Sequence, residues 1–135
     1  MKKALPESLQ HTIDAMLEAE TQISYGKPEI YNAFVSPNAN TTAVSASGRV
    51  MTGADAVREA TVNVSKGNIG ERNRFVEKIA CDYVEGMCFF VIKSGVEIDK
   101  EDGTTDNLCW VITYVLKEID GKWMLVHRQN TRSKP

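Results

Sequence analysis

The sequence predicts an α+β fold, in which helices pack on one face of a curved, mainly antiparallel β-sheet. Two observations support this prediction. Apolar residues recur at helical spacing through the first half of the chain, and from about residue 74 they follow the extended pattern of strands. Helices therefore come first and a long meander comes last, an order typical of α+β domains.

Three helices and a short strand pair are expected in the first half. Apolar residues keep to one face of an amphipathic helix over residues 6–25, interrupted by Glu20. Pro28 can open a second, short helix, in which Tyr31 and Phe34 stand three residues apart and can point the same way. The other elements expected here are a weak strand pair, at residues 41–46 and 49–51, and a third helix from a capping turn at 52–55 to about residue 65.

Four long strands are expected in the second half, after a polar loop at residues 66–72. Their expected positions are residues 74–84, 87–99, 107–119 and 122–131. The chain of 135 residues has the size of one domain and contains no repeat or linker, so residues 1–135 are interpreted as a single domain.

Composition argues against several classes of function. The 16 basic and 18 acidic residues give a net charge of -2 without long runs of one sign, so neither nucleic acid nor a membrane surface is an expected partner. No apolar run is long enough to span a bilayer and no signal segment is evident, which predicts a cytoplasmic protein. No metal or cofactor is expected, because His11 and His127 lie in remote segments and no phosphate-binding glycine loop occurs.

The three cysteines are expected to be reduced residues of the core. Cys81, Cys88 and Cys109 cannot all pair with one another, none forms a CxxC motif, and all three lie in apolar stretches with strand character.

Two segments resemble a known superfamily. Two motifs resemble sequences of the nuclear transport factor 2-like superfamily. They are GRVMTGADAVREA at residues 48–60 and the pattern Asp-Gly-Lys-Trp-x-x-Val-His at residues 120–127. The SnoaL-like domains and the association domain of calcium/calmodulin-dependent protein kinase II are similar in pattern over nearly the whole chain. The resemblance implies a cone-shaped domain, usually dimeric, with about three helices on the concave face of the sheet and a pocket between them. Its members include isomerases, cyclases, dehydratases, ligand-binding domains and scaffolds, so the fold alone does not give the function.

The sequence departs from the superfamily pattern at two places. Many members carry a second histidine two residues after the first, whereas Gln129 follows His127 here. Catalytic branches often have an acidic residue after the second helix, where this chain reads Ser-Pro-Asn at residues 36–38. Because asparagine cannot abstract a proton, this departure argues against isomerase-type chemistry.

The pairing of the last two strands decides which side chains face the pocket. A two-residue type I′ turn at Asp120-Gly121 would place Tyr114 opposite His127 and make that histidine the best general base in the chain. A three-residue loop with a bulge would instead give the pairs Glu118–Lys122, Tyr114–Val126, Ile112–Arg128 and Trp110–Asn130. The resemblance favours the second register, which we prefer and which turns His127 to the outer face as a structural residue.

The preferred register predicts a largely apolar pocket face with a few polar groups. Arg128 could hold a carboxylate or enolate, Tyr114 could donate to a carbonyl oxygen, and Asn130 could do either. The alternative is that the aromatic residues belong to the core and that Arg128 and Asn130 are exposed. The complete predicted set adds residues from the helical side and, by resemblance, from the neighbouring strand: Trp110, Tyr114, Arg128, Asn130, Phe90, Ile92, Ser94, Tyr31 and Phe34.

Three functional hypotheses follow. The leading one is a domain that binds a small molecule in this pocket. We expect this domain to be a homodimer, because both faces of the late strands are apolar and the outer face needs a cover. The alternative is that the outer face stays partly exposed to water. The second is an isomerase, cyclase or dehydratase acting on an apolar carbonyl compound, with His127 or Tyr114 as the weak candidates for proton transfer. The third is a dimeric scaffold without a ligand, which would have a filled interior.

Overall fold

The computed structural model describes residues 4–67 and 72–134. Within them the chain forms three helices and six strands, close to the predicted bounds. In chain order these are α1 (Glu7–Ser24), α2 (Glu29–Asn32), β1 (Thr42–Val44), β2 (Val50–Thr52), α3 (Ala54–Gly67), β3 (Arg72–Val84), β4 (Met87–Asp99), β5 (Thr105–Ile119) and β6 (Lys122–Ser133). The ends of the predicted polar loop belong to α3 and β3, and residues 68–71 lie outside the described residues.

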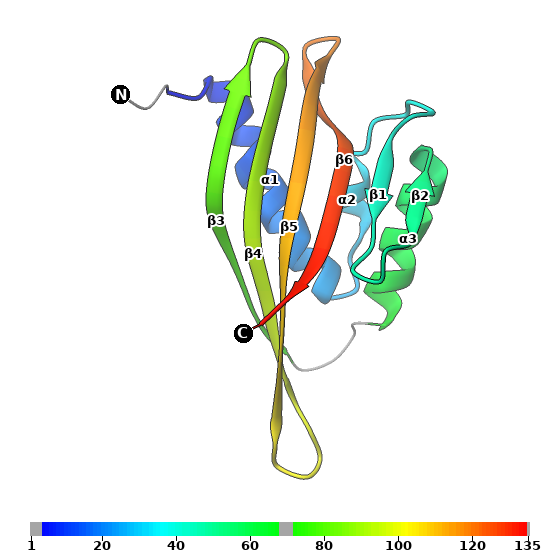
Figure 1. Ribbon diagram of the computed structural model, residues 1–135, viewed down its shortest axis with the longest axis vertical. Helices are drawn as coiled ribbons and strands as arrows, with labels where there is room; N and C mark the ends of the chain where they lie inside the picture. Colours follow the sequence, from blue (N-terminus) through cyan, green and yellow to red (C-terminus); the bar gives the residue numbers. More distant parts are fainter. Residues whose placement is uncertain (1–3, 68–71, 135) are drawn as a thin grey trace.

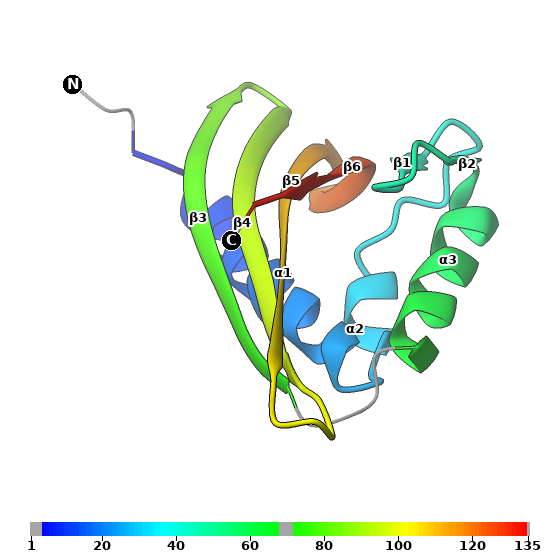
Figure 2. The same cartoon turned by 60° about the horizontal axis from the view of Figure 1, so that its bottom comes forward.

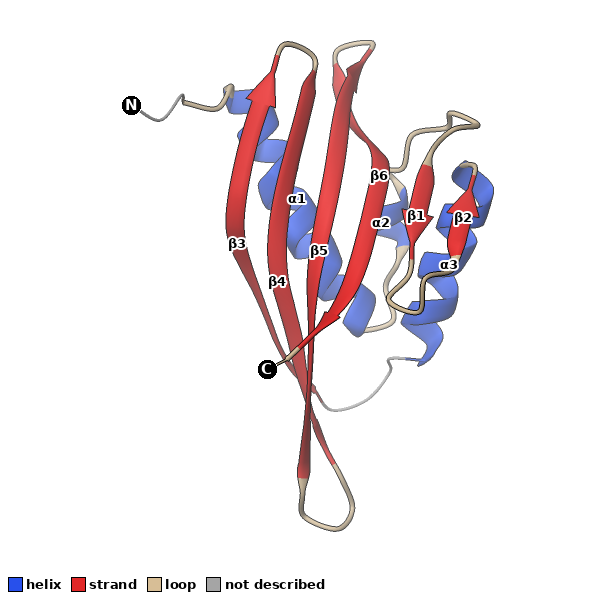
Figure 3. Cartoon of the chain, in the orientation of Figure 1, coloured by secondary structure: helices blue, strands red, loops and turns tan. Residues whose placement is uncertain are grey.

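The strands form one curved, open sheet, and the helices cover a single face of it. The strand order is β2-β1-β6-β5-β4-β3, and every neighbouring pair is antiparallel except β1 with β6. Figure 1 looks onto the outer face, with the helices behind the strands, and Figure 3 separates helices and strands by colour. Figure 2 shows the sheet bending over α1 and α2, with α3 beneath the short strands. The predicted α+β class, with a curved and mainly antiparallel sheet, is confirmed.

The core lies between α1 and the concave face of the sheet. The apolar stripe of α1 is buried apart from Leu17, which is partly buried, and along β4 and β5 alternate side chains point towards it. Each such buried side chain contributes roughly 1.5–3 kcal/mol relative to exposure. The main contributors are Leu9, Ile13, Met16, Phe90, Ile92, Ile112 and Leu116. No helix among the described residues is long and apolar enough to cross a bilayer.

The turn between β5 and β6 corrects the preferred register. Asp120 and Gly121 have φ angles of 51° and 78°, and Ile119 pairs with Lys122 across a two-residue loop. A type I′ turn requires positive φ at both central residues, a condition that Asp-Gly meets easily. The predicted pairing of Glu118 with Lys122 is therefore wrong.

A β-bulge in the middle of β6 restores the expected faces. Val126 is the extra residue, and beyond it Tyr114 lies opposite Arg128 and Ile112 opposite Asn130. Neither predicted register contains these pairs. Because the bulge shifts β6 by one residue, Tyr114, Arg128 and Asn130 nevertheless share the concave face.

Candidate functional site

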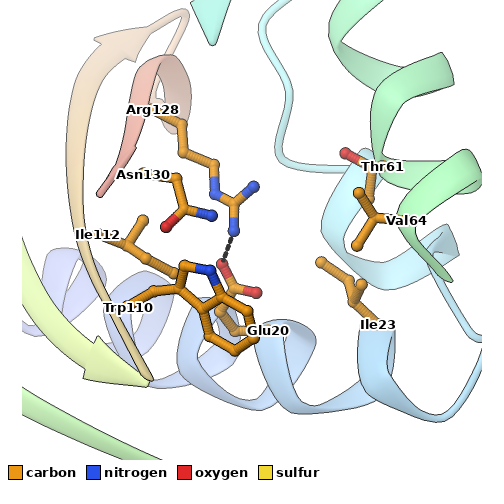
Figure 4. A pocket seen from close by; sticks show the side chains of 8 residues that line it. All are labelled: Glu20, Ile23, Thr61, Val64, Trp110, Ile112, Arg128 and Asn130. Carbon is orange, nitrogen blue, oxygen red and sulfur yellow. Dashed lines mark hydrogen bonds and ion pairs between the residues drawn. The ribbon is translucent and has the colours of Figure 1, made fainter. Parts of the chain in front are cut away.

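A buried carboxylate on α1 organises the polar part of the concave face. Glu20 is 2% exposed and accepts hydrogen bonds from the Tyr114 hydroxyl and from the guanidinium of Arg128, whose Nη2 lies 2.6 Å from Glu20 Oε1. Figure 4 shows the arginine reaching down from β6 to the carboxylate. A buried carboxylate is costly unless it is paired and hydrogen-bonded, and the opposed positions of Tyr114 and Arg128 supply both partners.

Aromatic rings flank the guanidinium. Its Cζ lies 5.5 Å from the ring centroid of Tyr31 and 5.8 Å from that of Tyr114, within the range of cation–π contacts. Burial acts to lower the pKa of Arg128, but the negative charge of Glu20 and its hydrogen bond with the guanidinium act against burial, so the pKa lies above its ordinary value and the side chain stays cationic. Burial also raises the pKa of Tyr31 well above its ordinary value, although Arg128 opposes this shift. Tyr31 is therefore a neutral hydrogen-bond donor at physiological pH.

A cleft runs between α3 and the sheet beside this network. Two cavities share Thr61, Val64, Arg128 and Asn130 in their walls, so they are two lobes of one cleft. The smaller lobe, of about 60 Å³, extends from these shared residues towards Glu20 and the other residues that line it, Ile23, Trp110 and Ile112. In Figure 4, Thr61 and Val64 face Arg128 and Asn130 across the lobe.

The larger lobe extends towards the hairpin of β1 and β2. Its volume is about 280 Å³, and Tyr31 belongs to its wall. The walls are mainly apolar, while the hairpin adds hydroxyl groups and the exposed Arg49. The remaining lining residues are Ala43, Val44, Ser45, Ser47, Met51, Val57, Ala60 and Asn63.

Three buried polar atoms on residues that line the cleft lack a hydrogen-bond partner among the described residues. They are the hydroxyl of Tyr31, Nε of Arg128 and Oδ1 of Asn130. Such atoms are uncommon in native proteins, because each one costs about 1–3 kcal/mol in lost hydrogen bonding with water. None of the three atoms is accessible from the cleft, so they lie behind its wall.

The predicted site residues divide between the cleft and the core beneath it. Tyr31, Trp110, Arg128 and Asn130 line the cleft. Tyr114 lies in the core on the same face and contacts the cleft residues Glu20 and Arg128. The others belong to the core or pack against it and line neither lobe: Phe90, Ile92, Ser94 and Phe34.

His127 lies on the outer side of the sheet. It pairs with Val115, next to the concave pair of Tyr114 and Arg128, and its Nδ1 lies 2.7 Å from Oγ1 of Thr42 on β1. In this position the ring points away from the cleft, as the preferred register expected. A role for His127 as general base in the cleft does not fit this geometry.

Several lining residues were not predicted from the sequence. Thr61 and Val64 are ordinary residues of an amphipathic helix, and nothing in the sequence marks them as facing a cleft. Glu20 did carry a signal, because a carboxylate inside an apolar stripe must find partners in the core. The described residues contain no group of three or more side chains suited to hold a metal ion.

The fold is found among solved structures, whereas the sequence matches neither a family model nor a curated protein. A ketosteroid isomerase-like protein from Erwinia carotovora superposes with a TM-score of 0.75 at 12% identity, covering 97% of this chain and 100% of that chain. A candidate dehydratase of the nuclear transport factor 2-like family from Streptomyces avermitilis gives 0.74 at 14% identity, covering 96% of each chain.

An association domain belongs to the same group of structures. That of the calcium/calmodulin-dependent protein kinase II of C. elegans gives a TM-score of 0.69 at 15% identity, covering 91% of this chain and 94% of that chain. The protein therefore has the nuclear transport factor 2-like fold, as the sequence resemblance implied. At these identities the likeness concerns the fold alone.

Proposed function

We propose that the cleft between α3 and the sheet binds a small, largely apolar molecule. The observation that carries this proposal is the two-lobed cleft itself, whose mainly apolar walls include the polar side chains of Arg128 and Asn130. Ligand sites combine these two features, because apolar walls supply affinity and a few polar groups fix the orientation. A scaffold without a ligand gains nothing from such a cleft.

The test is a binding screen with a blocked variant. A mixed panel of small alcohols, ketones, amides and carboxylates is titrated against the labelled protein, and backbone chemical shifts are followed by NMR. Val64 is 49% exposed and lines both lobes, so Val64→Trp should fill the cleft without disturbing the core. Val50→Trp, at a site that is 62% exposed and lines neither lobe, is the matched control. Shifts that vanish only in Val64→Trp support the proposal, and a panel without any such shift contradicts it.

A second candidate function is proton-transfer catalysis at the smaller lobe. The observation that favours it is Glu20, a carboxylate that lines this lobe and is held by Tyr114 and Arg128. Positioned carboxylates serve as general bases next to carbonyl groups. In this version Glu20 takes the role that the sequence offered to His127 or Tyr114.

Deuterium exchange tests this second candidate. If Glu20 abstracts protons next to a carbonyl, the protein should speed the exchange of α-hydrogens of cyclohexanone in deuterium oxide, and Glu20→Gln should abolish the effect. Val50→Trp should exchange as fast as the unaltered protein. Equal exchange with and without protein would leave ligand binding as the only proposed function.

We also propose that the outer face of the sheet joins two copies of the chain. Large apolar side chains on β3 and β4 are 43–64% exposed, and a groove of about 290 Å³ lined by these strands and by Val115 of β5 is almost wholly apolar. The side chains are Phe75, Ile79, Val84, Met87 and Phe89. A second copy is the favoured occupant because a patch that spans two long strands suits an isologous, self-complementary contact. Likeness to association domains supports the same proposal.

A further inference from the structure

Two cysteines lie in contact on the concave face of the sheet, away from the cleft. The Sγ atoms of Cys81 on β3 and Cys88 on β4 are 4.0 Å apart, and both thiols are free. Cys88 is buried in the core, whereas Cys81 is only partly buried and packs against it. Cys81 is therefore the thiol of the pair that a reagent in solution can reach.

The third cysteine faces the other side of the sheet. Cys109 lies opposite Gly95 on β4, and its Sγ is 3.1 Å from the position that a Cβ atom at Gly95 would occupy. Successive residues of a strand point to opposite faces, so Gly95 and Cys88 face opposite sides of β4. Cys109 therefore cannot reach the pair while the sheet is intact, and it serves as an internal control.

The position of the pair in the sheet favours a bond that forms and breaks easily. Cys81 lies opposite Phe90, and Cys88 lies opposite Tyr83, so the two cysteines are diagonal neighbours. The Cα atoms of diagonal neighbours are about 7–8 Å apart, slightly more than in a relaxed disulfide, so the strands must draw together and the bond is strained. The edge strand β3 is paired on one side only and has a bulge at Ile79, which makes this movement possible. Strained disulfides are the more easily reduced ones.

We propose that Cys81 and Cys88 form a reversible redox pair, which a low-molecular-weight disulfide such as glutathione disulfide converts into a bond between β3 and β4. The thiolate of Cys81 attacks one sulfur of glutathione disulfide, forms a mixed disulfide and releases one glutathione thiolate. Cys88 then gives up its proton and attacks Sγ of Cys81, which releases the second glutathione thiolate. Each released thiolate takes up the proton that one cysteine has lost. Two protein thiols are thereby oxidised, and one glutathione disulfide is reduced to two molecules of glutathione.

The order of the two steps follows from burial. Burial, aided by the neighbouring thiol of Cys81, raises the pKa of Cys88 to about 12, so Cys88 stays protonated near neutral pH and is a poor first nucleophile. Once Cys81 is part of a mixed disulfide, Cys88 already lies beside it. This proximity compensates for the small fraction of thiolate at Cys88.

Peptide mapping of the full chain tests the proposal. The protein is incubated with glutathione disulfide, the remaining thiols are alkylated, and the chain is cleaved at Glu85, which separates Cys81 from Cys88 in the sequence. We expect two of the three thiols to be lost and the two fragments to stay joined. An excess of reduced glutathione should restore all three thiols and release the fragments.

Two variants distinguish the roles of the cysteines. Cys88→Ser keeps the exposed thiol but lacks the second one, so it should accumulate the mixed disulfide of Cys81 with glutathione. The unaltered protein should not accumulate this species. Cys109→Ser should form the same joined fragments as the unaltered protein.

Three results would overturn the proposal. They are the survival of all three thiols in glutathione disulfide, a mixed disulfide that accumulates equally in the unaltered protein and in Cys88→Ser, and fragments joined through Cys109. The mapping of the unaltered protein decides the matter even if Cys88→Ser does not fold. The proposed ligand binding is independent of each of these results, because neither Cys81 nor Cys88 lines the cleft.

Discussion

At the scale of single residues, the pair of Glu20 and Arg128 determines both the stability and the chemistry of the cleft. Arg128→Met should lower the free energy of unfolding by about 3 kcal/mol, because it leaves a buried carboxylate without its cation. Urea denaturation at pH 7 measures this. The ion pair of Lys100 and Asp106 is half exposed, so Lys100→Met should cost less than about 1 kcal/mol. Equal costs for the two variants would show that the pair at Glu20 is not buried in solution.

The thiol of Cys88 should make stability depend on alkaline pH. Burial, aided by the neighbouring thiol of Cys81 at an Sγ–Sγ distance of 4.0 Å, raises the pKa of Cys88 from 9.0 to about 12. Between these two values the unfolded chain releases the proton and the native protein keeps it. The stability that the protonated thiol of Cys88 adds to the native protein is complete below pH 9 and declines as the pH rises towards 12. Urea unfolding from pH 8 to 10.5 should therefore show a steeper loss of stability for the unaltered protein than for Cys88→Ala, and parallel slopes would refute this.

At the scale of elements, the β5–β6 hairpin depends on the left-handed residues of its turn, Asp120 and Gly121. Gly121 has a φ of 78°, a conformation that costs a residue with a side chain about 1–2 kcal/mol. Gly121→Ala should therefore lower the unfolding free energy by about 1 kcal/mol. Gly121→Asn should cost clearly less, because asparagine tolerates this conformation. The urea midpoints of the two variants decide the matter, and a harmless alanine would argue against the type I′ turn.

The same hairpin shows what one sequence can and cannot predict about an element. The strand bounds followed from periodicity, and Asp120-Gly121 carried the correct turn chemistry. Nothing in the sequence indicates the bulge at Val126, because a bulge depends on how β6 fits the twist of the whole sheet and not on the residue itself. The prediction was wrong about the turn and missed the bulge. Each error by itself reverses the face on which Arg128 lies, so together they leave the predicted face right although the predicted pairs are wrong.

At the scale of the whole molecule, the fold was easier to predict than the cleft. The order of helices and strands can be predicted from the local periodicity of apolar residues, whereas the cleft depends on where α3 lies relative to β6. Thr61 and Arg128 are far apart in the chain, and no local pattern connects them. Glu20 is intermediate between the fold, which could be predicted, and the cleft, which could not. Its place in an apolar stripe predicts a buried partner, but only the assembled sheet shows which residues are its partners.

The outer face of the sheet gives the last prediction. Phe89 is 44% exposed and belongs to the wall of the apolar groove on β3 and β4. If two copies meet there, Phe89→Asp should bury a charge without a partner and weaken dimerisation by about 2 kcal/mol, or roughly 30-fold. Val50→Asp, on the distant edge strand β2, should leave the dimer intact. Light scattering over a range of protein concentrations measures both variants. A monomeric unaltered protein at micromolar concentration would contradict the proposed dimer, whereas a dimer that survives Phe89→Asp would place the contact on another surface.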